Sequence, residues 1–178
     1  FTRTGYTFAG WARDSANADT TGIALADGKY SVYNLTSALN GEVEIFAKWQ
    51  AITYSITFEE NGADAQVADL DTVVYDQAIE LAQPTKTGYD FAGWSTENGV
   101  VSNATTITSL VVGDKTYTTV SEYLVGESKV GGIYRIAVEK GYTYYAFNLT
   151  ATTEAKTVYA IWTEGLARYK VEYYLEKL

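Results

Sequence analysis

The chain has 178 residues, and its 13 Lys and Arg against 22 Asp and Glu give it a formal charge of −9. This acidity argues against nucleic acid or an anionic membrane surface as a partner, while 47% hydrophobic residues indicate a packed core. The absence of Cys and His excludes disulfides, thiolate chemistry and the commonest general base and metal ligand. We therefore expect no catalytic residue, no cofactor and no metal site.

The contents of tyrosine and proline indicate the class of secondary structure. The chain contains 16 Tyr and only 1 Pro, and this composition favours strands over helices. It has no Met, no signal peptide and no apolar run of about 18 residues, which a spanning helix needs. We expect no membrane insertion within these residues, and we expect both ends to be cut from a longer protein.

The first predicted element is the octet TGYTFAGW at residues 4–11, which recurs as TGYDFAGW at residues 87–94. Alternation puts its Tyr and Phe on one face of a strand and its Trp on the other. A glycine precedes each Trp, and we predict a bulge there that returns the Trp to the same face. The predicted structural core consists of Tyr6, Phe8, Trp11, Trp49, Tyr89, Phe91, Trp94 and Trp162.

An acidic segment with Asp14, Asn17 and Asp19 follows the first octet. Such spacing suggests a calcium loop, but Ala occupies positions 16 and 18, where an EF-hand-like loop needs oxygen ligands. We therefore predict an ordinary solvated loop.

Two further segments recur after the octets. Asn-Leu-Thr occurs at residues 34–36 and 148–150, where the Asn is typical of a turn, and a closing strand occurs at residues 44–49 and 157–162. The octets are 83 positions apart and the later segments about 113, so the second copy carries about 30 additional residues. They form an insertion at about residues 95–146.

Residues between the two copies predict the front half of a repeat. Period-two alternation over residues 53–58 predicts a half-buried strand, residues 60–62 a turn and residues 72–75 a second strand. Residues 169–174 alternate in the same way as residues 53–58. We therefore predict the C-terminal half of a first repeat at 1–50, a complete repeat with its insertion at 51–164, and the opening strand of a third repeat at 165–178.

The insertion has its own predicted elements. Residues 106–112 and 115–120 favour a hairpin, although residues 119–124 also suit the start of a short helix, and residues 133–138 and 142–147 favour strands. Its tyrosines form either a ligand-binding platform or ordinary sheet packing, and at least one of the adjacent pair Tyr144 and Tyr145 is expected to be exposed. The candidate ligand-binding residues are Tyr117, Tyr123, Tyr134, Tyr142, Tyr144 and Tyr145.

The order of TGYxFAGW, NLT and a closing aromatic-Ala-x-Trp strand resembles the Listeria–Bacteroides repeat, a module of bacterial surface proteins related to the B-repeat of internalin B. The resemblance implies a mostly β (α+β) chain of tandem β-grasp-like (ubiquitin-like) units at the bacterial cell surface, outside the cell. It implies no catalytic residues.

Two functions follow as expectations. The first is a non-enzymatic structural or adhesion repeat module that acts as a stalk or spacer. The alternative is a ligand-binding module that recognises a glycan or a host protein through the 95–146 insertion. Exposed strand edges also predict self-association between chains.

Overall fold

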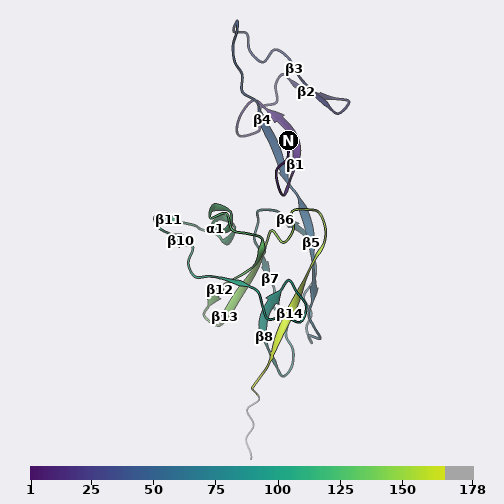
Figure 1. Ribbon diagram of the computed structural model, residues 1–178, viewed down its shortest axis with the longest axis vertical. Helices are drawn as coiled ribbons and strands as arrows, with labels where there is room; N and C mark the ends of the chain where they lie inside the picture. Colours follow the sequence, from purple (N-terminus) through teal and green to yellow (C-terminus); the bar gives the residue numbers. More distant parts are fainter. Residues whose placement is uncertain (167–178) are drawn as a thin grey trace, which may run out of the picture.

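The computed structural model describes residues 1–166 and shows two units joined end to end in an elongated molecule (Figure 1). We call residues 1–51 the N-terminal unit and residues 53–166 the large unit. Strands dominate both, and the only helix among the described residues has seven residues, so the prediction of a mostly β chain is confirmed. The predicted domain boundaries stay predictions, and the third repeat at 165–178 lies almost entirely outside the described residues.

The N-terminal unit consists of two antiparallel strand pairs. In the first pair, β1 (Tyr6–Ala12) lies beside β4 (Phe46–Ala51), and in the second, β2 (Ile23–Ala26) lies beside β3 (Lys29–Val32). Asp27 and Gly28 join the second pair with φ values of 49° and 71°, as a tight hairpin turn requires. Among the described residues, β4 pairs with β1 alone, so its other edge is open.

The first sheet of the large unit is formed mainly by the predicted repeat. Its four strands lie in the order β6 (Leu70–Val74), β5 (Thr53–Glu59), β14 (Lys156–Glu164) and β8 (Tyr89–Ser95). The opening strand β5 runs parallel to the closing strand β14, and the other neighbours are antiparallel. The predicted strands at 53–58 and 72–75 correspond to β5 and β6.

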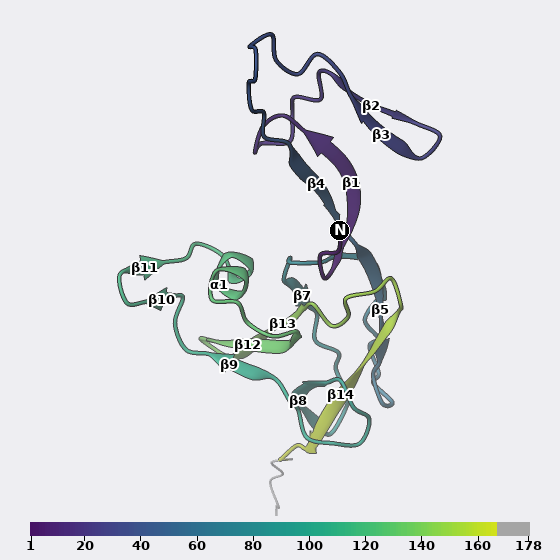
Figure 2. The ribbon, with the colours of Figure 1, turned by 45° about the horizontal axis from the view of Figure 1, so that its top comes forward.

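Three strands of the second sheet, β9 (Thr105–Ile107), β12 (Gly132–Val138) and β13 (Gly141–Phe147), come from the predicted insertion. The strand order of this sheet is β7 (Ile79–Leu81), β13, β12 and β9, with β12 and β9 parallel. The helix α1 (Val120–Gly126) and the short hairpin β10 (Val111–Val112) with β11 (Lys115–Thr116) follow β9 (Figure 2).

The predicted hairpin over 106–120 was too long, because the hairpin is confined to residues 111–116 and the helix α1 begins at Val120. Thr119 caps α1 by accepting a hydrogen bond from the backbone N–H of Glu122, whose carboxylate reaches back to the Thr119 backbone. This capping box satisfies donors at the helix start, so the alternative of a helix from residue 119 is confirmed. The strands predicted at 133–138 and 142–147 are confirmed as β12 and β13.

Two hydrophobic cores lie on the two faces of the second sheet. The main core joins it to the first sheet and includes Ile56, Phe58, Leu81, Trp94, Ile133, Tyr144 and Val158. The smaller core joins it to α1 and consists of Ile107, Leu124, Tyr134 and Phe147. The large unit is therefore layered as sheet, sheet and helix (Figure 2).

Both octets contain the predicted bulge. In β1 the register with β4 shifts between Phe8 and Gly10, and β8 shifts at the equivalent place against β14. Gly10 and Gly93 have φ values of 127° and 124°, which side-chain-bearing residues rarely adopt. Each Trp thereby returns beside the Phe of its octet, with ring centroids 5.3 Å and 5.4 Å apart in the two units.

Candidate functional site

The joint between the two units brings together residues that lie 70 positions apart in the chain. The Gly5 backbone carbonyl accepts a 3.0 Å hydrogen bond from the N–H of Ile52, whose own carbonyl accepts one from the N–H of Tyr75. Gly5 is buried with φ 75°, and a Cβ added there would run into the Tyr75 ring. Only glycine therefore allows the N-terminal unit to approach this ring so closely.

Tyr6, the next residue of the octet, adds a polar contact to the joint. Its hydroxyl donates a 2.6 Å hydrogen bond to Oδ2 of Asp76, and its ring meets the Tyr75 ring edge-on at 5.8 Å. The Arg3 guanidinium lies 3.8 Å from the centroid of the Tyr6 ring, a cation–π contact. Burial, followed by the bond to Asp76, raises the pKa of the Tyr6 hydroxyl above its usual 10.0.

Asp76 is oriented by an asparagine of the large unit. The Asp76 N–H donates to Oδ1 of Asn148 at 2.7 Å, and Nδ2 of Asn148 donates to Oδ1 of Asp76 at 2.8 Å. Both residues have positive φ, 61° and 45°. Oδ2 of Asp76 is thereby left to accept the hydrogen bond from Tyr6. Contacts within the large unit alone therefore orient the Asp76 carboxylate toward the N-terminal unit.

Sequence analysis missed Tyr75 and Asp76 as functional residues. A Tyr-Asp pair after a strand is typical of any surface turn, and about 70 residues separate Asp76 from Tyr6. The octet and Asn148 were found through their repetition, and Asn148 follows β13 directly with a positive φ of 45°. A contact that joins two units leaves no such local pattern in the sequence.

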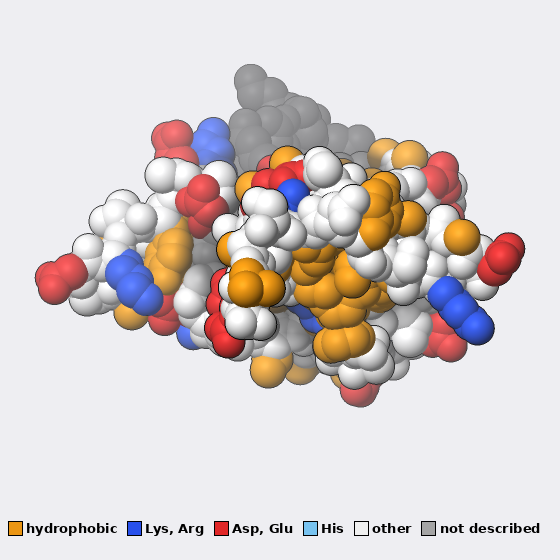
Figure 3. Space-filling view, turned by 90° about the horizontal axis from the view of Figure 1, so that it is seen from above, with side chains coloured by type: hydrophobic (Ala, Val, Ile, Leu, Met, Phe, Trp, Pro, Cys, Tyr) orange, Lys and Arg blue, Asp and Glu red, His pale blue; other side chains and the backbone are white. Residues whose placement is uncertain are grey.

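The predicted core residues differ in burial between the units. In the large unit Trp94 is fully buried and lies 4.8 Å from the Phe58 ring, whereas Tyr89 is 43% exposed. In the N-terminal unit Phe8 is 36% exposed, and Phe1 packs against its ring. The remaining five are half-buried: Tyr6, Trp11, Trp49, Phe91 and Trp162. Figure 3 looks down on the molecule from above and shows hydrophobic side chains gathered in the middle of this face.

The six candidate tyrosines of the insertion are distributed over both cores. Tyr144 is buried in the main core and Tyr134 in the smaller one. The other four, Tyr117, Tyr123, Tyr142 and Tyr145, are half-buried, and the rings of the first two meet edge-on at 5.7 Å. The structure does not bring the six together on one surface, and a role in ligand binding stays a prediction.

A hollow of about 480 Å³ lies beside α1. Its lining is formed by Asp76, Tyr117, Ser121, Glu122, Val125 and Gly126. The Tyr117 hydroxyl donates to the Glu127 carboxylate, which raises the pKa of that hydroxyl. The hollow therefore combines the apolar side chain of Val125 with the Tyr117 ring and the two carboxylates of Asp76 and Glu122, and it adjoins the joint at Asp76.

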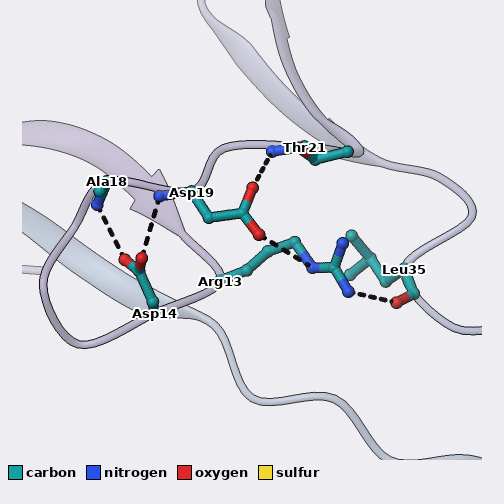
Figure 4. A network of polar contacts seen from close by, with 6 residues as sticks. All are labelled: Arg13, Asp14, Ala18, Asp19, Thr21 and Leu35. Carbon is teal, nitrogen blue, oxygen red and sulfur yellow. Dashed lines mark hydrogen bonds and ion pairs between the residues drawn. The ribbon is translucent and has the colours of Figure 1, made fainter.

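The acidic loop after β1 is organised by backbone hydrogen bonds (Figure 4). The Asp14 carboxylate accepts from the N–H groups of Ala18 and Asp19, at 2.8 Å and 3.1 Å. Asp19 accepts from the Thr21 N–H at 2.8 Å, a bond that lowers the pKa of this carboxyl. Each carboxylate thus accepts hydrogen bonds from different backbone N–H groups of the loop, and the two are not arranged around a shared ion.

Within residues 1–166 no group of three or more acidic, His or Cys side chains is arranged to hold a metal ion. No helix in the described part of the chain is long and apolar enough to cross a membrane.

Comparison with known proteins found one family and two curated relatives. The Listeria-Bacteroides repeat domain matches residues 1–36 and 54–118. Two proteins of Evansella cellulosilytica are similar to the chain. One, named "Putative Gly-rich membrane protein", is 29% identical over 112 residues, or 63% of the chain, and the other, named "Putative membrane protein", is 27% identical over 90 residues, or 51% of the chain. The chain spans 12% of the length of each relative, and no solved structure matches it.

Proposed function

Because the chain belongs to the Listeria–Bacteroides repeat family, we propose that it is a non-enzymatic structural module of a bacterial cell-surface protein. Its work is that of a stalk or spacer, which holds consecutive units at a fixed separation outside the cell and can present an adhesive part. The names of the two Evansella relatives, both called membrane proteins, support a place at the cell envelope.

The proposed fold of each complete unit is β-grasp-like. The order of the first sheet supports this, because the opening hairpin β5–β6 lies beside a closing strand that runs parallel to β5. A β-grasp uses the same arrangement of its first two strands and its last strand. In this chain the second sheet, instead of a long helix, covers the face of the first.

The observation that carries the spacer proposal is the joint. β4 and β5 are separated only by Ile52, which is 8% exposed, so there is no flexible linker between the units. Gly5 and Tyr6 on one side, with Tyr75 and Asp76 on the other, oppose rotation about this connection. A spacer needs such resistance to bending.

The rigidity of the joint is testable by electron paramagnetic resonance, because the chain has no Cys and labels attach only where Cys is introduced. We would label exposed positions Ala9 and Glu139, one in each unit, and measure the distance distribution by double electron–electron resonance. A narrow distribution is expected, and Gly5→Ala should broaden it. The control is Gly99→Ala, at an exposed glycine with φ 74° and no neighbour within 4 Å. A broad distribution in the unmodified chain would refute the spacer function.

Ligand recognition through the insertion is the second candidate, and the hollow beside α1 supports it. Val125 lines this hollow and is 45% exposed, while Val138 on β12 is 47% exposed and lies outside it. The full chain would be tested on glycan and extracellular-matrix arrays. Binding that Val125→Asp removes and Val138→Asp retains would favour this function over a plain spacer.

A further inference from the structure

The end of the large unit away from the N-terminal unit repeats half of the joint (Figure 1). There the N–H of Gly165 donates to the carbonyl of Gly88 at 2.9 Å, as the N–H of Ile52 donates to Gly5 at 3.0 Å. Gly88 has φ 79°, close to the 75° of Gly5. The backbone of the second octet therefore presents at this end the same surface that the first octet presents to Tyr75.

The side chains around the two glycines also correspond. Lys86 Nζ lies 4.6 Å from the centroid of the Tyr89 ring, as the Arg3 guanidinium lies 3.8 Å from that of Tyr6. In both places the N–H of the Tyr donates to the carbonyl of the basic residue, at 3.1 Å and 3.0 Å. A basic side chain therefore lies over a tyrosine ring both at the joint and at the opposite end of the large unit.

The two places differ in what covers them. Gly5 is buried under the Tyr75 ring, whereas Gly88 is exposed, and a Cβ there would meet no described atom within 4 Å. Tyr89 is 43% exposed. A shallow hollow of about 330 Å³ lies here, lined by Gly88, Tyr89, Asp90, Gly165 and Leu166.

We propose that this end face, which consists of residues 86–89 with Gly165, is the docking site for a further repeat unit. The partner is a turn with a Tyr-Asp pair like that of Tyr75 and Asp76. Its ring packs on Gly88 and its carboxylate accepts a hydrogen bond from the Tyr89 hydroxyl. This inference rests on the spacer function proposed above. Because the end face repeats the Gly5 and Tyr6 side of the joint, its partner is expected to resemble the Tyr75 and Asp76 side.

The partner turn must be held in advance to bind in this way. In the existing joint Asn148 fixes Asp76 through two hydrogen bonds, so one carboxylate oxygen is presented outward. We therefore expect a docking partner to be a folded unit that contains both the acid and its asparagine, and an unstructured peptide with Tyr-Asp to bind more weakly. The Lys86 ammonium beside Tyr89 supplies a positive charge for the incoming carboxylate.

The test is a tandem duplication of residues 53–165 within the full chain. The second copy of Thr53 then follows Gly165 directly, in the same way that the first Thr53 follows Ile52. The Tyr75-Asp76 turn of the second copy is thereby brought to the end face of the first. Spin labels at Glu139 of both copies report the orientation of the two large units. We expect a single narrow distance distribution, which Gly88→Ala in the first copy broadens and Gly99→Ala leaves unchanged. Gly99 is a matched control, because its φ of 74° is close to the 79° of Gly88 and neither glycine has a neighbour within 4 Å of an added Cβ.

Labels at Ala9 and at Glu139 of the first copy, in the same duplicated protein, separate the two proposals. A broad distribution between the two Glu139 positions, with a narrow one between Ala9 and Glu139, overturns the docking site and leaves the spacer function standing. Broad distributions at both joints overturn both. A narrow distribution that Gly88→Ala and Asp76→Asn in the second copy fail to broaden shows that the copies pack through another surface, which also overturns the proposal.

Discussion

The two units build the same strand pair but bury it to different extents. β1 pairs with β4 in the same register, bulge included, as β8 pairs with β14. Trp94 is nevertheless fully buried, while Trp11 is half-buried. β5 contributes to this difference, because its Phe58 ring lies 4.8 Å from Trp94 and has no counterpart in the N-terminal unit among the described residues. The strand pair that contains the octet therefore forms without an opening strand, and β5 adds to the core that buries Trp94 in the large unit.

The correspondence between the units extends further than the octet. Tyr30 on β3 covers Gly10 and lies 5.7 Å from the Phe8 ring, and Tyr144 on β13 covers Gly93 and lies 5.6 Å from Phe91. The hairpin β2–β3 is thus the counterpart of β12–β13. Besides β5, β6 and β7, the elements that only the large unit has among the described residues are β9, β10, β11 and α1, which lie between β8 and β12.

The largest expected difference concerns the two tryptophans. Trp94→Ala should lower the free energy of unfolding by about 3–5 kcal/mol, because it removes a fully buried side chain and leaves a cavity. Trp11→Ala should cost markedly less, since its ring is half-exposed already. Urea unfolding followed by circular dichroism measures both. Equal losses would show that the N-terminal unit is as well packed as the large unit.

A second comparison uses the bulge glycines. A Cβ on Gly93 would lie 2.6 Å from Ser102 Oγ and 2.8 Å from the buried Tyr144 hydroxyl, so Gly93→Ala should lose about 1–3 kcal/mol through overpacking, besides the backbone strain. Gly10→Ala has similar strain, but Tyr30 is on a short exposed hairpin that can shift. The same unfolding measurement should rank Gly93→Ala as the more damaging change. The reverse order would mean that β2–β3 is held as firmly as the second sheet.

A third change addresses the part that only the large unit has. Thr119→Ala removes the cap of α1 and should cost about 1 kcal/mol, because the Glu122 N–H loses its acceptor. Hydrogen exchange should accelerate at residues 120–126 and stay unchanged in β5 and β14. Faster exchange in those strands would show that the helix is needed by the scaffold.

The smallest expected effect is the pH dependence of the joint. Folding raises the pKa of Tyr6 above 10.0, so its contribution is fully present below that pH and is lost as the pH rises through the raised value. Ionised Tyr6 would face the Asp76 carboxylate without a proton to share. The distance distribution between Ala9 and Glu139 should therefore broaden above about pH 10, and Tyr6→Phe should remove that contribution.

Tyr75 also packs in the joint, and its pKa is raised by burial and by Asp76. Broadening that persists unchanged in Tyr6→Phe would assign the pH effect to Tyr75 in place of Tyr6. A distribution that stays narrow at all pH values would show that the Tyr6–Asp76 bond contributes nothing to the rigidity of the joint.

Local chemistry allowed the sequence by itself to determine much of this protein. The repeated octet specified a strand with a bulge at Gly10 and Gly93, because only glycine tolerates that backbone and because Phe and Trp must share a core. Alternation located β5, residues 133–138 and 142–147 favoured the strands β12 and β13, and a helix from residue 119 stood as the alternative to a longer hairpin. These features depend on neighbouring residues, so they are visible in a single sequence.

Only the tertiary structure decided the joint and the distribution of the tyrosines. The contact between Tyr6 and Asp76 spans 70 residues, and no periodicity connects a glycine with the ring that covers it. Tyr134 and Tyr144 share a hairpin but enter different cores, because a second sheet with the helix beyond it gives both of its faces something to pack against. Burial depends on which layers meet, and that is a property of the folded chain.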